Sequence, residues 1–144
     1  MNTIQRISCT LTIGMVYALS ACAQNSSEAF RGKFFNSEHK VWMEIDFLNK
    51  NVAVPQQEDI FSDVAGYIGH ETDPRKWIIV DADLHQQTAK LSIINDYGSE
   101  DLEATLRLNS DSTFTLTQKE GSSIKFAVDK KWRKLPKQLI FKRP

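Results

Sequence analysis

The clearest structural signal in the chain is Leu102-Glu103-Ala104-Thr105-Leu106-Arg107-Leu108, in which every second residue is apolar. The polar cluster Asn109-Ser110-Asp111-Ser112 follows, and Phe114 and Leu116 then resume the alternation. Successive side chains of a strand point to opposite faces, and polar residues between two alternating runs are typical of a turn. This stretch therefore predicts a hairpin of two antiparallel strands with one buried face.

Apolar residues alternate in the same way on either side of this hairpin. Between Lys40 and Leu48, one face carries Val41, Met43, Ile45 and Phe47, while Trp42 falls on the opposite, polar face. After a turn at Glu120-Gly121, the alternation resumes through Ile124, Phe126 and Val128. Further strands are expected from Gly32, from Asn51 to Val54, from Thr88 to Asn95 and from Gln138 to Lys142.

The middle of the chain departs from simple alternation. Trp77-Ile78-Ile79-Val80 is apolar on both faces, which predicts a strand that is central in the sheet or covered on its outer side. Asp63 to His70 predicts a strand in which Gly66 and Gly69 mark a bulge, a bend or the close approach of another backbone. We expect Glu71-Thr72-Asp73-Pro74-Arg75 to form a turn and Asp81 to Gln87 to be a connection.

These runs predict an all-β domain. No internal repeat, heptad or amphipathic helix of convincing length is present, which leaves about eight to ten short antiparallel strands joined mostly to their neighbours. Such strands form either a small barrel or a two-layer sandwich, because both architectures bury one face of each strand.

The N-terminal residues carry a different kind of signal. An apolar run from Ile7 follows Arg6 and closes with Leu19-Ser20-Ala21-Cys22. This tetrapeptide resembles the lipobox of bacterial lipoprotein precursors, which implies cleavage before Cys22 and acylation of its thiol, including palmitate. The expected organisation is a signal peptide over 1–21, a lipidated tether over 22–29 and a β-domain over 30–144. By the same resemblance, Ala23 after the cysteine implies the outer membrane of a Gram-negative bacterium, on its periplasmic or its surface face.

A second processing site overlaps the first. Ala21-Cys22-Ala23 also fits the small-x-small pattern of an ordinary secretory signal, which would release a soluble chain starting at Gln24. In the lipoprotein prediction Cys9 is removed and Cys22 carries lipid, so no cysteine remains for a disulfide.

The domain itself resembles, in its arrangement, the small lipocalin-like barrels found on bacterial lipoproteins. Gly32-Lys33-Phe34-Phe35 near the start and Lys131-Trp132-Arg133 near the end stand where such barrels keep a glycine-aromatic pair and a closing basic residue. Phe34 replaces the tryptophan usual at that place. The resemblance implies a barrel that could hold a small apolar ligand.

The charges divide into an acidic middle and a basic end. The chain has 18 basic and 18 acidic residues, but the segment from Lys125 to Arg143 contains one acid, Asp129, among its many lysines and arginines. We expect this segment to neutralise acidic neighbours in the sheet or to present an anion-binding surface. Nucleic acid is not an expected partner, because the cell envelope lacks it.

Candidate catalytic and metal sites are few. The chain has no nucleophile elbow, phosphate-binding glycine loop or His-Glu-x-x-His motif, so we expect neither enzymatic activity nor a cofactor. Metal ligands could come from Asp81, Asp83 and His85, or from His70, Glu71 and Asp73, but both groups also suit polar turns. The oxygen-rich Asn95 to Asp101 predicts either a cation site or an Asx-type turn.

Aromatic residues provide the remaining candidates. Five of them could stack on a ligand or fill the core: Trp42, Tyr67, Trp77, Tyr97 and Trp132. Trp42 is singled out because it lies on a polar face, where it is either an exposed interface anchor or covered by Lys131 or Arg133. The candidate interface is therefore Trp42, Lys131, Trp132 and Arg133.

Together these features predict a lipid-anchored, non-enzymatic binding protein of the cell envelope. The membrane contact would be the lipid on Cys22, and the expected partner is another envelope protein, as for an envelope complex component or an immunity-type lipoprotein. The alternative is a lipocalin-like carrier of a small apolar ligand, which requires an internal cavity.

Overall fold

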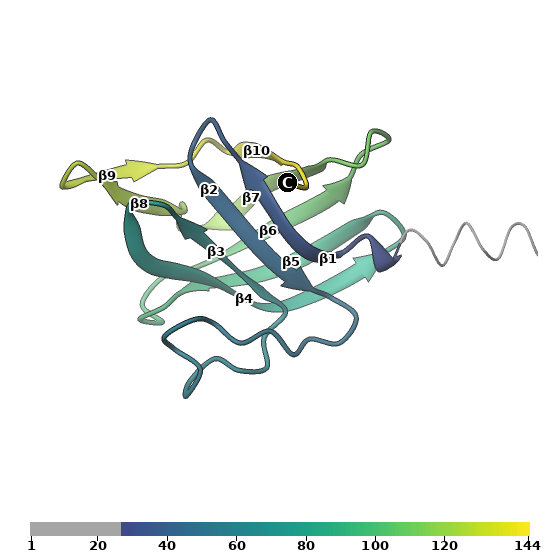
Figure 1. The fold of residues 1–144 in the computed structure, drawn as a ribbon, viewed down its shortest axis with the longest axis horizontal. Helices are drawn as coiled ribbons and strands as arrows, with labels where there is room; N and C mark the ends of the chain where they lie inside the picture. The colour runs from purple at the N-terminus through teal and green to yellow at the C-terminus, as the bar shows by residue number, and fades with distance from the viewer. Residues whose placement is uncertain (1–26) are drawn as a thin grey trace, which may run out of the picture.

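The computed structural model describes residues 27–144, which form ten β-strands (Figure 1). The all-β class and the expected number of strands are confirmed. The proposed signal peptide and Cys22 lie outside the described residues. Within residues 27–144, no helix has the length and apolar character needed to cross a membrane.

The strands are β1 (Arg31–Asn36), β2 (Val41–Asp46), β3 (Gly66–His70), β4 (Asp73–His85), β5 (Thr88–Asn95), β6 (Asp101–Leu108), β7 (Phe114–Gly121), β8 (Lys125–Val128), β9 (Lys131–Lys134) and β10 (Gln138–Phe141).

Eight of the strands form one antiparallel sheet that is almost closed into a barrel. The order is β1-β2-β3-β4-β5-β6-β7-β10, so every neighbour except β10 follows directly in the chain. The first and last strands meet where the Phe35 amide donates to the Lys142 carbonyl at 2.7 Å and the Lys142 amide donates back at 2.8 Å. The Asn36 side chain adds a bond to the Ile140 carbonyl. Of the two predicted architectures, the chain therefore adopts the barrel.

Large apolar side chains fill the barrel. The predicted inward faces of β2, β6 and β7 are buried as expected, including Met43, Leu106 and Leu116. Near the start of β1, Phe30 packs between Phe47 and Phe114, with ring centroids 5.7 and 4.9 Å away. These aromatic rings fill one end of the barrel, the end at which the described chain begins.

A hairpin made of β8 and β9 covers the other end (Figure 1). Ile124 and Phe126 point inward and are fully buried, while Asp129 and Lys130 form the tight turn with positive φ angles of 52° and 64°. The sequence predicts a strand through Phe126 but not its partner β9. All four β9 residues are exposed, so no apolar alternation marks this strand.

An outer layer covers β3 and β4. The segment from 47 to 65 crosses their outer face, where Val54 and Val64 pack with Tyr67 and Ile78. This contact confirms the predicted outer cover at Ile78, whereas Val80 is 38% exposed and lies outside it. The strand predicted from Asn51 to Val54 is reduced to a single bridge between Val52 and Val64, because the segment serves as a cover and not as part of the sheet.

Two predictions around β4 were wrong. The turn expected from Glu71 to Arg75 is shorter, since β4 already begins at Asp73 and Pro74 lies in it. Pro74 is tolerated because the β3 and β4 ladder shifts register between Ile68 and His70, which also confirms the bulge predicted near Gly69. The connection expected from Asp81 is in fact strand as far as His85.

The close contact between Trp42 and Gly69 of β3 generates a test of the outer packing. The Trp42 ring lies over Gly69, and a Cβ placed on Gly69 would approach Trp42 Cζ2 to 2.6 Å. We expect Gly69→Ala to lower the free energy of unfolding by about 1–3 kcal/mol through overpacking. Urea unfolding followed by circular dichroism measures this loss. In a Trp42→Ala background the loss should be smaller, and an equal loss in both backgrounds would rule out the ring as its cause.

Candidate functional site

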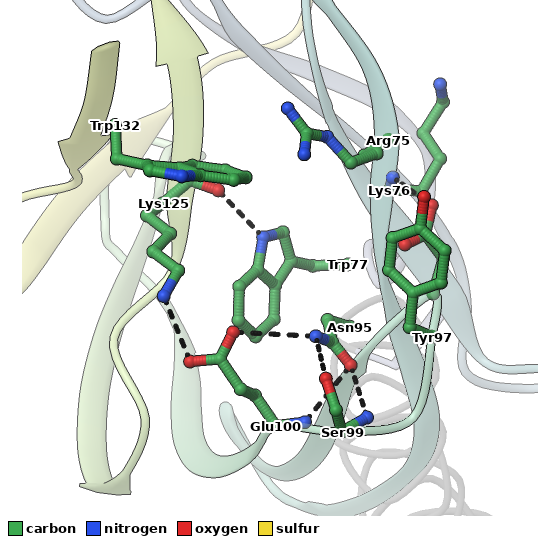
Figure 2. Close-up of a pocket in the computed structure, with 10 residues that line it drawn as sticks. Arg75, Lys76, Trp77, Asn95, Tyr97, Ser99, Glu100, Lys125 and Trp132 are labelled. Carbon is green, nitrogen blue, oxygen red and sulfur yellow. Dashed lines mark hydrogen bonds and ion pairs between the residues drawn. The ribbon is translucent and has the colours of Figure 1, made fainter.

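A groove opens at the hairpin end of the barrel, between the β8–β9 hairpin, the start of β4 and the end of β5 (Figure 2). Its volume is about 230 Å³. The sequence offers no single motif for this site, because its walls come from three separate parts of the chain. The lining residues are Arg75, Lys76, Trp77, Asn95, Asp96, Tyr97, Ser99, Glu100, Lys125 and Trp132.

Trp132 forms the hairpin wall of the groove. It is 57% exposed, although large aromatic side chains are usually more buried. The guanidinium carbon of Arg75 lies 4.2 Å from the centroid of the Trp132 ring, and Lys125 Nζ lies 5.6 Å away. Two cations near one indole are held by the negative potential of its face. This contact orients both Arg75 and the ring.

The back of the groove is rigid. Trp77 is 3% exposed and its indole Nε1 donates to the Lys125 carbonyl at 3.0 Å, which ties β4 to the hairpin (Figure 2). The Lys125 ammonium is paired with Glu100 at 3.2 Å. These bonds join the hairpin to both the barrel wall and the β5–β6 turn.

The opposite rim is the turn between β5 and β6. The Asn95 side-chain oxygen accepts from the amides of Ser99 and Glu100, at 2.9 and 3.1 Å. The segment is therefore a turn closed by the Asn95 side chain, but the bonded amides lie four and five residues further along and not two, as in an Asx-type turn. Tyr97 stands on this rim and is 77% exposed. Trp77, Tyr97 and Trp132 are the three candidate aromatic residues that converge here.

A buried carboxylate positions Arg75. Asp73 Oδ1 accepts from the Arg75 amide at 3.0 Å and from its Nε at 2.9 Å, while Oδ2 accepts from the Ala127 amide at 2.7 Å. Burial by itself raises the pKa of Asp73, but the bonds from Arg75 and Ala127 outweigh it and hold that pKa below its usual value. Asp73 thus connects β4, the groove arginine and the hairpin.

The cation over Trp42 is Lys76, with its Nζ 5.7 Å from the ring centroid. The expectation that Lys131 or Arg133 covers Trp42 was wrong, because both lie on β9 at the end of the barrel, whereas Trp42 packs half-buried on the outer wall over Gly69. Burial lowers the pKa of Lys76, whose ammonium donates to the Pro74 carbonyl.

The remaining candidates lie apart from the groove. Asp81, Asp83 and His85 are exposed on the outer face of β4, where Lys50 pairs with Asp81 and His85 with Asp83. His70 is buried against Phe126 and its Nδ1 bonds to Thr72, while Tyr67 donates to Glu44. Among residues 27–144, no three histidine, cysteine, aspartate or glutamate side chains are grouped to hold a metal ion.

Comparisons of the chain with protein-family models, with curated proteins and with solved structures find no match. Sequence reasoning missed Arg75 as a site residue, because it placed this arginine in a turn. Its only sequence signal is Asp73, two residues earlier.

The Asp73 bonds predict a pH-dependent stability. Asp73→Asn should lower the free energy of unfolding at pH 7 by about 1–3 kcal/mol. The reason is that the asparagine side chain places an NH2 donor where one of the backbone amides of Arg75 and Ala127 needs an acceptor oxygen. The wild-type contribution is complete above the unfolded pKa of about 3.9 and is lost as the pH falls through the lower folded pKa. Urea unfolding at several pH values should therefore show the two proteins converging in acid.

Asp59→Asn provides the matched control, because Asp59 is exposed and its carboxylate accepts no hydrogen bond within residues 27–144. It should leave unfolding unchanged. A gap between wild type and Asp73→Asn that stays constant from neutral to acidic pH would contradict the role given to the Asp73 carboxylate.

Proposed function

We propose that this protein is a lipid-anchored, non-enzymatic binding protein of the Gram-negative cell envelope, and that it holds a partner protein in the groove beside Trp132. The observation that carries the proposal is the convergence of Trp132, Tyr97 and Arg75 in one hollow. Tryptophan, tyrosine and arginine are the residue types that dominate the binding energy of protein interfaces. Both aromatic side chains are largely exposed, so they are available to a partner.

The direction in which the groove faces supports this function. The described chain begins beside Phe30 at one end of the barrel, and the β8–β9 hairpin covers the opposite end (Figure 1). A lipid on Cys22 would therefore hold the barrel by the end far from the groove. The groove would face away from the bilayer, where an envelope protein could reach it.

The filled interior supports surface binding over the alternative of a lipocalin-like carrier. Phe34, Phe114, Phe126 and Phe141 all point into the barrel and are at most 1% exposed. A carrier needs an internal cavity, commonly of about 300–1,000 Å³. The barrel topology itself suits both functions, and native mass spectrometry of the purified protein would reveal a retained lipid.

The cations of β9 lie beside the groove and do not line it. Lys131 and Arg133 flank Trp132 in sequence and are exposed, and Arg133 lines a separate hollow with His70 and Phe126. Exposed cations at the rim of an interface mainly steer a partner and set specificity. Trp42, the other tryptophan of the predicted interface, is half-buried on the outer wall, so Trp132 is the anchor that we favour.

Partner capture tests the groove. We expect Trp132→Ala to weaken capture of an envelope partner by about thirtyfold, because truncating an interface hot spot costs about 2 kcal/mol or more. The measurement is quantitative pull-down from envelope membranes with purified variants. Ile60→Ala is the control, since Ile60 is 76% exposed on the outer loop and should have no effect. Equal recovery of the same proteins by wild type and Trp132→Ala would exclude the groove.

The anchor has a separate test. The intact mass of the mature protein from membranes should correspond to a chain that begins at Cys22 and carries acyl groups, since several chains on one residue hold a protein firmly at a bilayer. Cys22→Ser should lose this mass and leave the membrane fraction. An unmodified N-terminus at Gln24 would show simple secretion instead.

A further inference from the structure

We propose that the groove recognises a carboxylate of the partner, bound by the two terminal nitrogens of Arg75, with an adjacent apolar side chain lying between Trp132 and Tyr97. The inference rests on the proposed function in taking the partner to be a protein. It adds the chemistry that selects the partner: an acidic side chain or a chain terminus next to an apolar residue.

Arg75 is held with one edge free. Its Nε donates to Asp73 and its face lies on the Trp132 ring, so two of its contacts are already fixed. Within residues 27–144, neither terminal nitrogen of Arg75 donates a hydrogen bond, and the side chain is 36% exposed. The guanidinium edge matches a carboxylate with two parallel hydrogen bonds. Because the group is already oriented, little further entropy is lost when it binds.

The acids of the groove are each engaged with other groups. Glu100 is paired with Lys125, and Asp73 accepts bonds from Ala127 and Arg75. Asp96 accepts from the Lys76 amide and from Gln57. The terminal nitrogens of Arg75 are thus left as unused donors that suit an anion.

The size and walls of the groove favour one residue of a peptide. A volume of about 230 Å³ is below the range of about 300–1,000 Å³ typical of pockets for whole small molecules. Trp132 and Tyr97 supply flat apolar surface on the two sides, and Trp77 closes the back (Figure 2). An apolar side chain next to the carboxylate would cover these rings, while the negative charge of the carboxylate stays at Arg75.

The experiment compares two probes that differ only at the carboxyl group, N-acetyl-phenylalanine and N-acetyl-phenylalanine amide; the amide lacks the charge and one of the two acceptor oxygens. Each is titrated into the full mature chain in detergent micelles, and the indole resonances of Trp132 and Trp77 and the Nε–H resonance of Arg75 are followed by NMR. We expect the acid to shift these resonances and to bind about tenfold or more tightly than the amide, since its bonds to Arg75 are charge-assisted. N-acetylglucosamine serves as a neutral sugar probe and should shift none of them.

Two variants assign the effect to Arg75. Arg75→Lys keeps the charge but loses the paired donors, so it should weaken the acid by about tenfold and leave the amide unchanged. Arg107→Lys is the matched control, because Arg107 is exposed on β6 away from the groove, and it should bind as wild type. The comparison of acid with amide on the wild-type chain needs no variant, so it stands even if Arg75→Lys unfolds.

Equal binding of acid and amide, no shift with either probe, or a response to the sugar alone would overturn the carboxylate site. Capture of a partner that still depends on Trp132 would then leave the proposed function standing. Conversely, a Trp132-independent capture together with selective binding of the acid would overturn the proposed function and keep the carboxylate site. The two failures are therefore distinguishable.

Discussion

Closure of the sheet by the paired hydrogen bonds between Phe35 and Lys142 is the constraint on which the rest of the structure depends. The bridge between β1 and Lys142 nearly closes the sheet into a barrel, and its inward faces must be filled by its own side chains. Only the two ends then remain to be covered. Phe30 fills one end, and the hairpin with Phe126 fills the other.

The cover at the hairpin end creates the groove. A two-stranded hairpin is marginal by itself, so β8 and β9 need anchors on the barrel. The anchors are the buried carboxylate of Asp73, which accepts from the Ala127 amide, and the indole of Trp77, which donates to Lys125. The same carboxylate orients Arg75 under Trp132, so the contacts that seat the hairpin also arrange the candidate binding residues.

Local patterns predicted much of the fold. Strict alternation identified β2, β6 and β7 because a buried face repeats every second residue. The apolar run at Trp77 predicted a central or covered strand, and the loop over Ile78 provides the cover. The strand β9 was missed because its side chains are all exposed, and the start of β4 was misplaced because Asp73 and Pro74 are usual turn residues that here lie beside a bulge.

The sequence alone determined the all-β class and the burial of the apolar face of the alternating strands such as β2, β6 and β7. It also predicts a lipid anchor at Cys22. These depend on residues that are neighbours in the chain. Only the tertiary structure decided between the barrel and the sandwich. It also brought together three residues of the groove, Arg75, Tyr97 and Trp132. The reason is physical: each strand needs only one buried face in either architecture, whereas the groove depends on which strand ends the closed sheet brings together.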